Sequence, residues 1–133
     1  MSASNAGRQN QLSIPDAEDL YRRIVADWII RDQTGRTRLA SAAFRQTDKR
    51  VSVDRSSLTT AEACLHRGDQ RHVGIVAVTA GQVRVLGEVV VPAPLEDNPA
   101  HAEILGPKHK ASSKRLAGEF ARWVYPPGAS PVG

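Results

Sequence analysis

The fold class is predicted most directly by residues 73–91, VGIVAVTAGQVRVLGEVVV. Residues 73–78 are apolar and mostly β-branched, which is typical of a buried strand. Residues 83–91 are interrupted by Gly87, and they predict either a second strand or a helical turn followed by a strand. These two segments together form the predicted centre of a β-sheet.

Further strands are predicted on both sides of this centre. Residues 51–54, VSVD, alternate apolar and polar side chains as a half-buried strand does. Residues 101–105, HAEIL, resume as a strand after a proline-rich loop at 92–99. Residues 28–44 combine a short apolar run with turn residues, and they predict a hairpin or a long loop between strands.

Two helices are predicted in the first half of the chain. The first begins near Ser13 or Pro15, where acidic side chains favour the positive end of a helix dipole, and it ends near residues 24–27. The second is short, and Thr59 followed by Glu62 matches the capping box with which such a helix begins.

A third helix is predicted from the clearest amphipathic pattern of the chain, KRLAGEFARWV at residues 114–124. Ser112 or Ser113 is expected to cap this helix. Aromatic side chains are few, and we expect those in this helix to be largely buried. The four predicted core aromatics are Trp28, Phe44, Phe120 and Trp123.

The chain has 133 residues, which lies inside the usual size of one domain. We therefore predict a single α+β domain over residues 13–125, with a mainly antiparallel or mixed sheet of about four to six strands. About three helices accompany the sheet, and the C-terminal helix packs on it. Residues 1–12 and 126–133 are predicted to be a disordered and a flexible tail.

Composition predicts a cytoplasmic protein without a membrane partner. No apolar stretch approaches the roughly 18 to 20 residues that span a bilayer, and the N-terminus lacks the apolar core of a signal peptide. The single Cys64 cannot form an intramolecular disulfide, and its apolar context, AEACL, favours a buried structural thiol. No metal site, cofactor or phosphate-binding glycine motif is predicted.

Basic side chains gather in two zones of the sequence. The chain has 18 Lys and Arg against 14 Asp and Glu, a formal net charge of +4, and the cations concentrate at residues 31–50 and 108–115. Such zones favour an anionic partner, either nucleic acid or an acidic protein. An ordinary solubilising surface is the alternative interpretation.

His101 and Glu103 are the first candidate for chemistry. Residues two apart on a strand project from one face, so the two side chains are expected to lie together. A histidine beside a carboxylate can act as a base with its orienting partner, or supply two metal ligands. In the alternative interpretation, His101 bonds the backbone at the edge of a loop and Glu103 is solvated.

Ser52, Asp54 and Arg55 form a second candidate site. A serine and an aspartate on one strand face, with an arginine beside them, can hold a phosphate or a ribose through charge-assisted hydrogen bonds. The same segment also matches a turn that leads into the next helix. The candidate catalytic residues are therefore His101, Glu103 and Arg55, and the candidate binding residues are Arg45, Asp54, Lys108, Lys110 and Lys114.

The sequence also carries two resemblances. The order SAAF, VSVDR, HAEILG and KRLAGEFARWV resembles an uncharacterised group of small bacterial proteins with SAF, SVD and HAxI blocks, over residues 20–127. This likeness implies no known activity. More faintly, LYRR at 20–23 and VSV at 51–53 resemble the opening of RES-type and ADP-ribosyltransferase-like toxin domains. That resemblance implies Arg22 or Arg23 and Ser52 as the first two motif positions, with Glu62 or Glu103 as the acid.

Two functions are expected from these features. The first is a non-catalytic binding or adaptor module, an operon-linked or genetic-conflict component that meets an anionic partner through its basic zones. The second is a small nucleotide- or RNA-directed enzyme, nuclease-like or ADP-ribosyltransferase-like. In that enzyme His101 is the acid or base, Glu103 orients it, and Arg45 or Arg55 stabilises phosphate charge. An enzyme brings His101, Glu103 and Arg55 into one pocket, whereas a binding module leaves them apart.

Overall fold

The computed structural model describes residues 14–45, 50–106 and 110–127, and of Lys110 only the backbone. The predicted tail at 1–12 and most of the one at 126–133 lie outside these ranges. The described residues form an α+β fold, so the predicted fold class is confirmed. Its main sheet has six strands: β1 (Asp19–Val25), β4 (Arg50–Arg55), β5 (His72–Thr79), β6 (Val89–Pro92), β7 (His101–Leu105) and β8 (Arg122–Tyr125).

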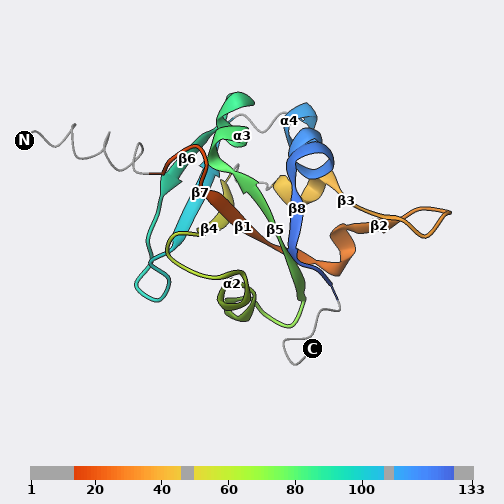
Figure 1. The fold of residues 1–133 in the computed structure, drawn as a ribbon, viewed down its shortest axis with the longest axis horizontal. Coiled ribbons are helices and arrows are strands. Elements are labelled where there is room, and N and C mark those ends of the chain that lie inside the picture. Colours follow the sequence, from red (N-terminus) through yellow and green to blue (C-terminus); the bar gives the residue numbers. More distant parts are fainter. Residues whose placement is uncertain (1–13, 46–49, 107–109, 128–133) are drawn as a thin grey trace, which may run out of the picture.

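The strands lie in the order β6-β7-β4-β1-β5-β8, and every pairing among them is antiparallel (Figure 1). A separate hairpin of β2 (Ile29–Arg31) and β3 (Thr37–Leu39) projects away from this sheet. Of the two alternatives predicted for residues 28–44, a hairpin or a long loop, the structure has the hairpin.

Short helices cover the sheet. The α-helices are α2 (Ala61–Arg67), α3 (Ala80–Val85) and α4 (Lys110–Arg115), and α4 continues into a π-helical turn, η3 (Leu116–Phe120). The 3-10 turns are η1 (Ala26–Trp28) and η2 (Ser41–Phe44). Within the described ranges, no helix has both the length and the apolar character that crossing a membrane requires.

The main core lies on one face of the sheet. Leu20 and Ile24 of β1 are fully buried there, together with apolar side chains of β4, β5, β6 and β7. Phe44 of η2 and Leu116 of η3 pack against them from outside the sheet. A smaller buried group, which contains Cys64 of α2, lies on the other face, so the sheet is covered on both sides.

The prediction of a helix that begins near Ser13 or Pro15 is wrong, because residues 19–25 form strand β1. Leu20, Arg22 and Ile24 are its buried side chains, at the period of two that a strand requires. A charged residue on the buried side hides this alternation in the sequence. Arg22 is accommodated because its Nε donates to the Ala43 carbonyl at 2.8 Å and its guanidinium lies 5.1 Å from the Trp28 ring centre.

The predicted C-terminal helix is too long. The helical segment ends at Phe120, and the chain then becomes extended and pairs with β5 as the edge strand β8. The aromatic and β-branched sequence RWVY suits a strand, which explains the change. Ser113 does not cap the helix, since its hydroxyl donates to the Phe44 carbonyl at 3.2 Å. Phe120 and Trp123 are only partly buried, contrary to the prediction.

Two other boundaries follow the sequence closely. Thr60, not the predicted Thr59, is the N-cap that precedes α2, and its hydroxyl accepts a hydrogen bond from the Ala63 N–H at 3.1 Å, so Glu62 does not occupy the position of the predicted capping box. Residues 83–91 form the end of α3 followed by β6, which is the second of the two predicted alternatives. The strands predicted at 51–54, 73–78 and 101–105 are confirmed as β4, β5 and β7.

Candidate functional site: a polar pocket over β1, β4 and β7

The face of the sheet opposite the main core carries polar side chains. The pairing of β4 with β7 places Asp54 opposite His101, and Ser52 opposite Glu103. Residues that face one another across an antiparallel pair share a face, and so do residues two apart on one strand. All four side chains therefore lie on the same face.

A pocket of about 480 Å³ opens on this face. Its walls come from β1, β4, the last turn of α2, the loop at residues 93–100, and the start of β7. We call it the polar pocket, since most of its lining side chains carry hydrogen-bonding groups. The lining residues are Arg23, Ser52, Arg67, Leu95, Asp97, Asn98 and His101.

Asp54 lies beneath the pocket and is fully buried. One carboxylate oxygen accepts from Nη2 of Arg23 at 2.9 Å, and the other accepts from Nδ2 of Asn98 at 2.9 Å. The pKa of the neighbouring Cys64 thiol is raised to about 12, mainly by burial. Arg23 lowers this pKa, and the Asp54 carboxylate raises it. Asp54 thus holds two pocket side chains in place, and Cys64 stays a protonated thiol at neutral pH.

Arg23 is anchored on one edge and open on another. Its Nε donates to the Cys64 carbonyl at 2.6 Å, while Nη1 has no hydrogen-bond partner among the described residues. A Cβ at Gly68, just after α2, would lie 2.9 Å from Cδ of Arg23 and 2.6 Å from Nδ1 of His72. Glycine at this position therefore allows the end of α2 to approach the arginine closely.

His101 has a defined tautomer in its neutral form. Its Nδ1 lies 2.8 Å from the Ala93 carbonyl oxygen. A carbonyl oxygen only accepts hydrogen bonds, so Nδ1 carries the proton and Nε2 is left as the acceptor. The backbone bond predicted for His101 in the alternative interpretation is thus present, and the same ring also lines the polar pocket.

The loop at residues 93–100 is fixed to the rest of the pocket. Leu95 and Asn98 exchange backbone hydrogen bonds of 3.0 and 3.1 Å, which close a tight turn. Nη1 of Arg67 donates to the Asp97 carbonyl and so joins the loop to α2. Oδ1 of Asn98 is buried and has no hydrogen-bond partner among the described residues.

The three candidate catalytic residues do not line one pocket. His101 lines the polar pocket, whereas Glu103 and Arg55 do not. One Glu103 carboxylate oxygen lies 4.0 Å from Nη1 of Arg50. Arg55 donates from Nε and Nη2 to the buried Glu18 carboxylate, at 3.2 and 3.0 Å.

The two basic zones meet on the other side of the sheet. The hydrogen bond from Ser113 to the Phe44 carbonyl joins η2 to α4, and Arg45 and Lys114 are each the next residue in sequence. Both of these side chains are exposed. Of the remaining candidate binding residues, Lys108 and the side chain of Lys110 lie outside the described residues.

The sequence did not indicate Arg67 or Asn98 as pocket residues. Arg67 is the last residue of α2, and its position depends on where that helix packs. Asn98 precedes a proline in a loop just before His101, and polar loop residues beside a candidate histidine were the only available signal. Arg23 and Ser52 were named, the first only through the toxin-domain resemblance.

Comparisons of the chain with protein-family models, with curated proteins and with solved structures give no match. Both resemblances therefore stay predictions. Among the described residues, no group of three or more His, Cys, Asp or Glu side chains is arranged to hold a metal ion. The polar groups that line the site belong to two arginines, Ser52, Asp97, Asn98 and His101.

Proposed function

We propose that this protein binds a small anionic ligand, one that carries a phosphate or carboxylate group, in the polar pocket. The observation that carries the proposal is the convergence of Arg23, Ser52, Arg67 and His101 from four separate elements on one pocket. This narrows the binding module expected from the sequence to a ligand of defined chemistry.

The donors of the pocket suit an anion. A guanidinium group binds carboxylate and phosphate oxygens through charge-assisted hydrogen bonds, and Arg23 retains a free Nη1 edge among the described residues. The Ser52 hydroxyl adds a neutral donor. Asp54, the carboxylate beneath the pocket, is already bonded to Arg23 and Asn98, so its charge is compensated.

A second candidate function is acid–base catalysis on a phosphate ester held in the same pocket. The orientation of His101 favours it, because a histidine with Nδ1 bonded to a carbonyl presents Nε2 as a base. Its test is release of nitrophenol from bis(p-nitrophenyl) phosphate. Turnover that a His101→Gln variant retains in full would exclude this role for the histidine.

Thermal unfolding with a panel of probes tests the binding proposal. Inorganic phosphate, citrate and adenosine monophosphate are compared with uncharged adenosine. A ligand at about 100 times its Kd stabilises the folded state by about 2.7 kcal/mol, which raises the Tm by several degrees. We expect such a shift for at least one anion and none for adenosine.

Variants locate the bound anion. Arg67→Gln should reduce the shift in Tm, because it removes a cation from the pocket lining. Arg67 is exposed, so the substitution does not open the core. Arg71→Gln is the matched control, since Arg71 is an exposed arginine that pairs with Asp69 outside the pocket. Equal shifts in the two variants, or equal shifts with adenosine, would contradict binding of an anion at this site.

A further inference from the structure

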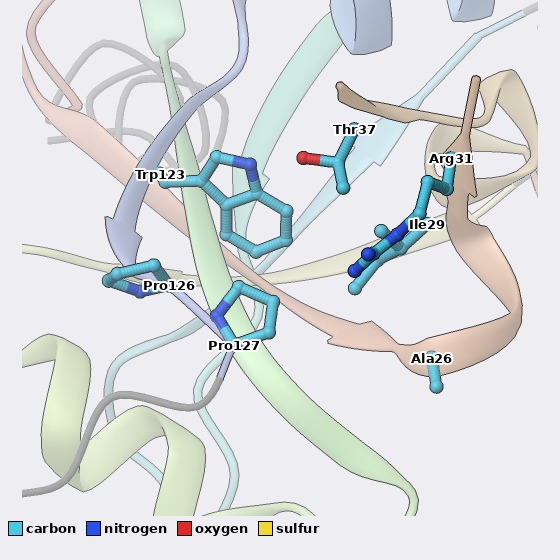
Figure 2. A pocket seen from close by; sticks show the side chains of 7 residues that line it. All are labelled: Ala26, Ile29, Arg31, Thr37, Trp123, Pro126 and Pro127. Carbon is cyan, nitrogen blue, oxygen red and sulfur yellow. The ribbon is translucent and has the colours of Figure 1, made fainter. Parts of the chain in front are cut away.

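A second hollow, of about 500 Å³, lies between the edge strand β8 and the projecting hairpin (Figure 2). We call it the edge groove. Most of its lining is apolar, with one arginine and one threonine from the hairpin. The lining residues are Ala26, Ile29, Arg31, Thr37, Trp123, Pro126 and Pro127.

The indole of Trp123 is the main flat surface of the edge groove. It is partly buried, and a Cβ at Gly74 of β5 would lie 2.9 Å from Cζ3 of this ring and 2.7 Å from the Tyr125 carbonyl oxygen. Because Gly74 has no side chain, the indole packs closely against the backbone of β5. Trp123 also lines a smaller hollow of about 240 Å³ beside Gly118, so the ring borders open space in two places.

The hairpin beside the groove is basic. Arg31, Arg36 and Arg38 are exposed, and none of the three makes an ion pair within the described ranges. Asp32 is the one acidic residue between positions 29 and 39, and its carboxylate accepts hydrogen bonds within the turn of the hairpin. It accepts from the Thr34 N–H at 2.8 Å and from the Thr34 hydroxyl at 2.6 Å.

Arg31 is the cation placed to act together with the indole. It lines the groove from β2, and Figure 2 shows its side chain across the hollow from the Trp123 ring. Residues two apart on a strand share a face, so Ile29 lies on the same side of β2 and gives this wall an apolar part. An apolar slot with a flat ring on one side and a cation on the other complements a planar base joined to a phosphate.

We propose that the edge groove binds single-stranded nucleic acid, with one base stacked on Trp123 and the adjoining phosphate held by Arg31. Stacking on aromatic side chains combined with a cationic track is the general means of binding single strands without sequence preference. A duplex would bind less well, since its base faces are covered by neighbouring bases. The proposal is independent of the anion in the polar pocket, because the two sites lie on opposite faces of the sheet. Trp123 pairs with Val76, a residue of the main core, whereas the polar pocket lies on the other face.

Fluorescence anisotropy with a labelled oligo(dT) strand tests this proposal. Trp123→Leu should weaken binding roughly tenfold or more, and Trp123→Phe, which keeps a ring, should weaken it less. Arg31→Gln should reduce the slope of log affinity against log salt by about 0.7, the value for one phosphate contact on a single strand. Arg31 is exposed, so this variant gives an answer even if Trp123→Leu does not fold.

Arg50→Gln serves as the matched control, since it removes an exposed charge of β4 that lines neither the edge groove nor the neighbouring hollow beside Ala26, and it should bind as the parent does. The proposal is overturned if the parent does not bind at low salt. It is equally overturned if Arg31→Gln and Trp123→Phe both bind as the parent does, or if a duplex of the same sequence binds as tightly. Displacement of the oligonucleotide by poly-glutamate at equal charge concentration would indicate an acidic protein partner instead.

Discussion

Asp54 is the residue on which the polar pocket depends most, because its fully buried carboxylate orients side chains from three directions. It accepts hydrogen bonds from Arg23 of β1 and from Asn98 of the 93–100 loop, and it lies beside the Cys64 thiol of α2. A buried charge is tolerated only when it is paired and hydrogen-bonded. Asp54 was predicted as a ligand-binding residue, and its two hydrogen bonds let it position Arg23 and Asn98, which line the pocket.

Removing this carboxylate should cost stability at the residue scale. Asp54→Ala leaves Arg23, whose side chain is 16% exposed, without its ion-pair partner, so we expect a loss of about 3 to 5 kcal/mol in the free energy of unfolding. Urea denaturation measures this loss. Asp69→Asn is the control, because it breaks the solvent-exposed pair with Arg71 and should change stability far less than Asp54→Ala does. Similar losses in both variants would contradict the role assigned to Asp54.

At the scale of elements, the two phenylalanines that pack against the main core should contribute unequally to the free energy of unfolding. Phe44 of η2 is 1% exposed, whereas Phe120 of η3 is partly buried and lies 5.1 Å beneath the Arg115 guanidinium. Phe44→Ala should therefore cost about 3 to 5 kcal/mol. Phe120→Ala should cost clearly less, because less of its surface is withdrawn from water. Denaturation midpoints of the two variants check this order, and an equal or larger effect at Phe120 would refute it.

The elements also show which parts of the fold were open to prediction from sequence. The strands β4, β5 and β7 were predicted because their apolar residues follow a strand pattern in the sequence itself. The strand β1 was missed because one of its inward positions is Arg22, whose burial depends on Trp28 and on the Ala43 carbonyl. Such partners come from other elements, so no local pattern can indicate them.

The end of the chain was mispredicted for a related reason. Residues 114–124 have helical periodicity, but the segment after Phe120 gains more by completing the edge of the sheet beside β5 than by continuing the helix. The candidate site shows the same limit. His101, Ser52 and Asp54 share strands that were predicted, whereas Arg67 and Asn98 reach the pocket through the packing of α2 and of a loop.

At the scale of the whole molecule, the sheet separates two kinds of surface. The polar pocket lies on the face covered by α2, and the edge groove and the meeting point of the basic zones lie on the side of η2, α4 and the hairpin. A ligand in the pocket and a strand in the groove would therefore not compete for the same residues. Both sites depend on the register in which β1 pairs with β4 and β5, so both should be lost when the sheet unfolds.

Glu18 supports that register at the entry to β1. Its buried carboxylate accepts from Arg55 at 3.2 and 3.0 Å, from the Ser57 N–H at 3.1 Å and from the Ser57 hydroxyl at 2.6 Å. Burial alone would raise the pKa of Glu18, but the hydrogen bonds from Arg55 and Ser57 outweigh it and lower that pKa below the ordinary 4.5. The ionised form is thus the one that the folded state stabilises.

This direction fixes how stability should depend on pH. A lowered folded-state pKa means that the contribution of Glu18 is fully present above pH 4.5 and is lost as the pH falls through the folded pKa. Glu18→Gln should therefore cost about 2 kcal/mol at pH 7, the scale of hydrogen bonds to a charged group, and clearly less in acid. Glu96→Gln, at an exposed position in the loop, should cost little at either pH. Urea denaturation of the three proteins across this pH range gives the comparison. A Glu18→Gln deficit that stays constant into acid would show that the ionised carboxylate does not hold the start of β1 to the end of β4.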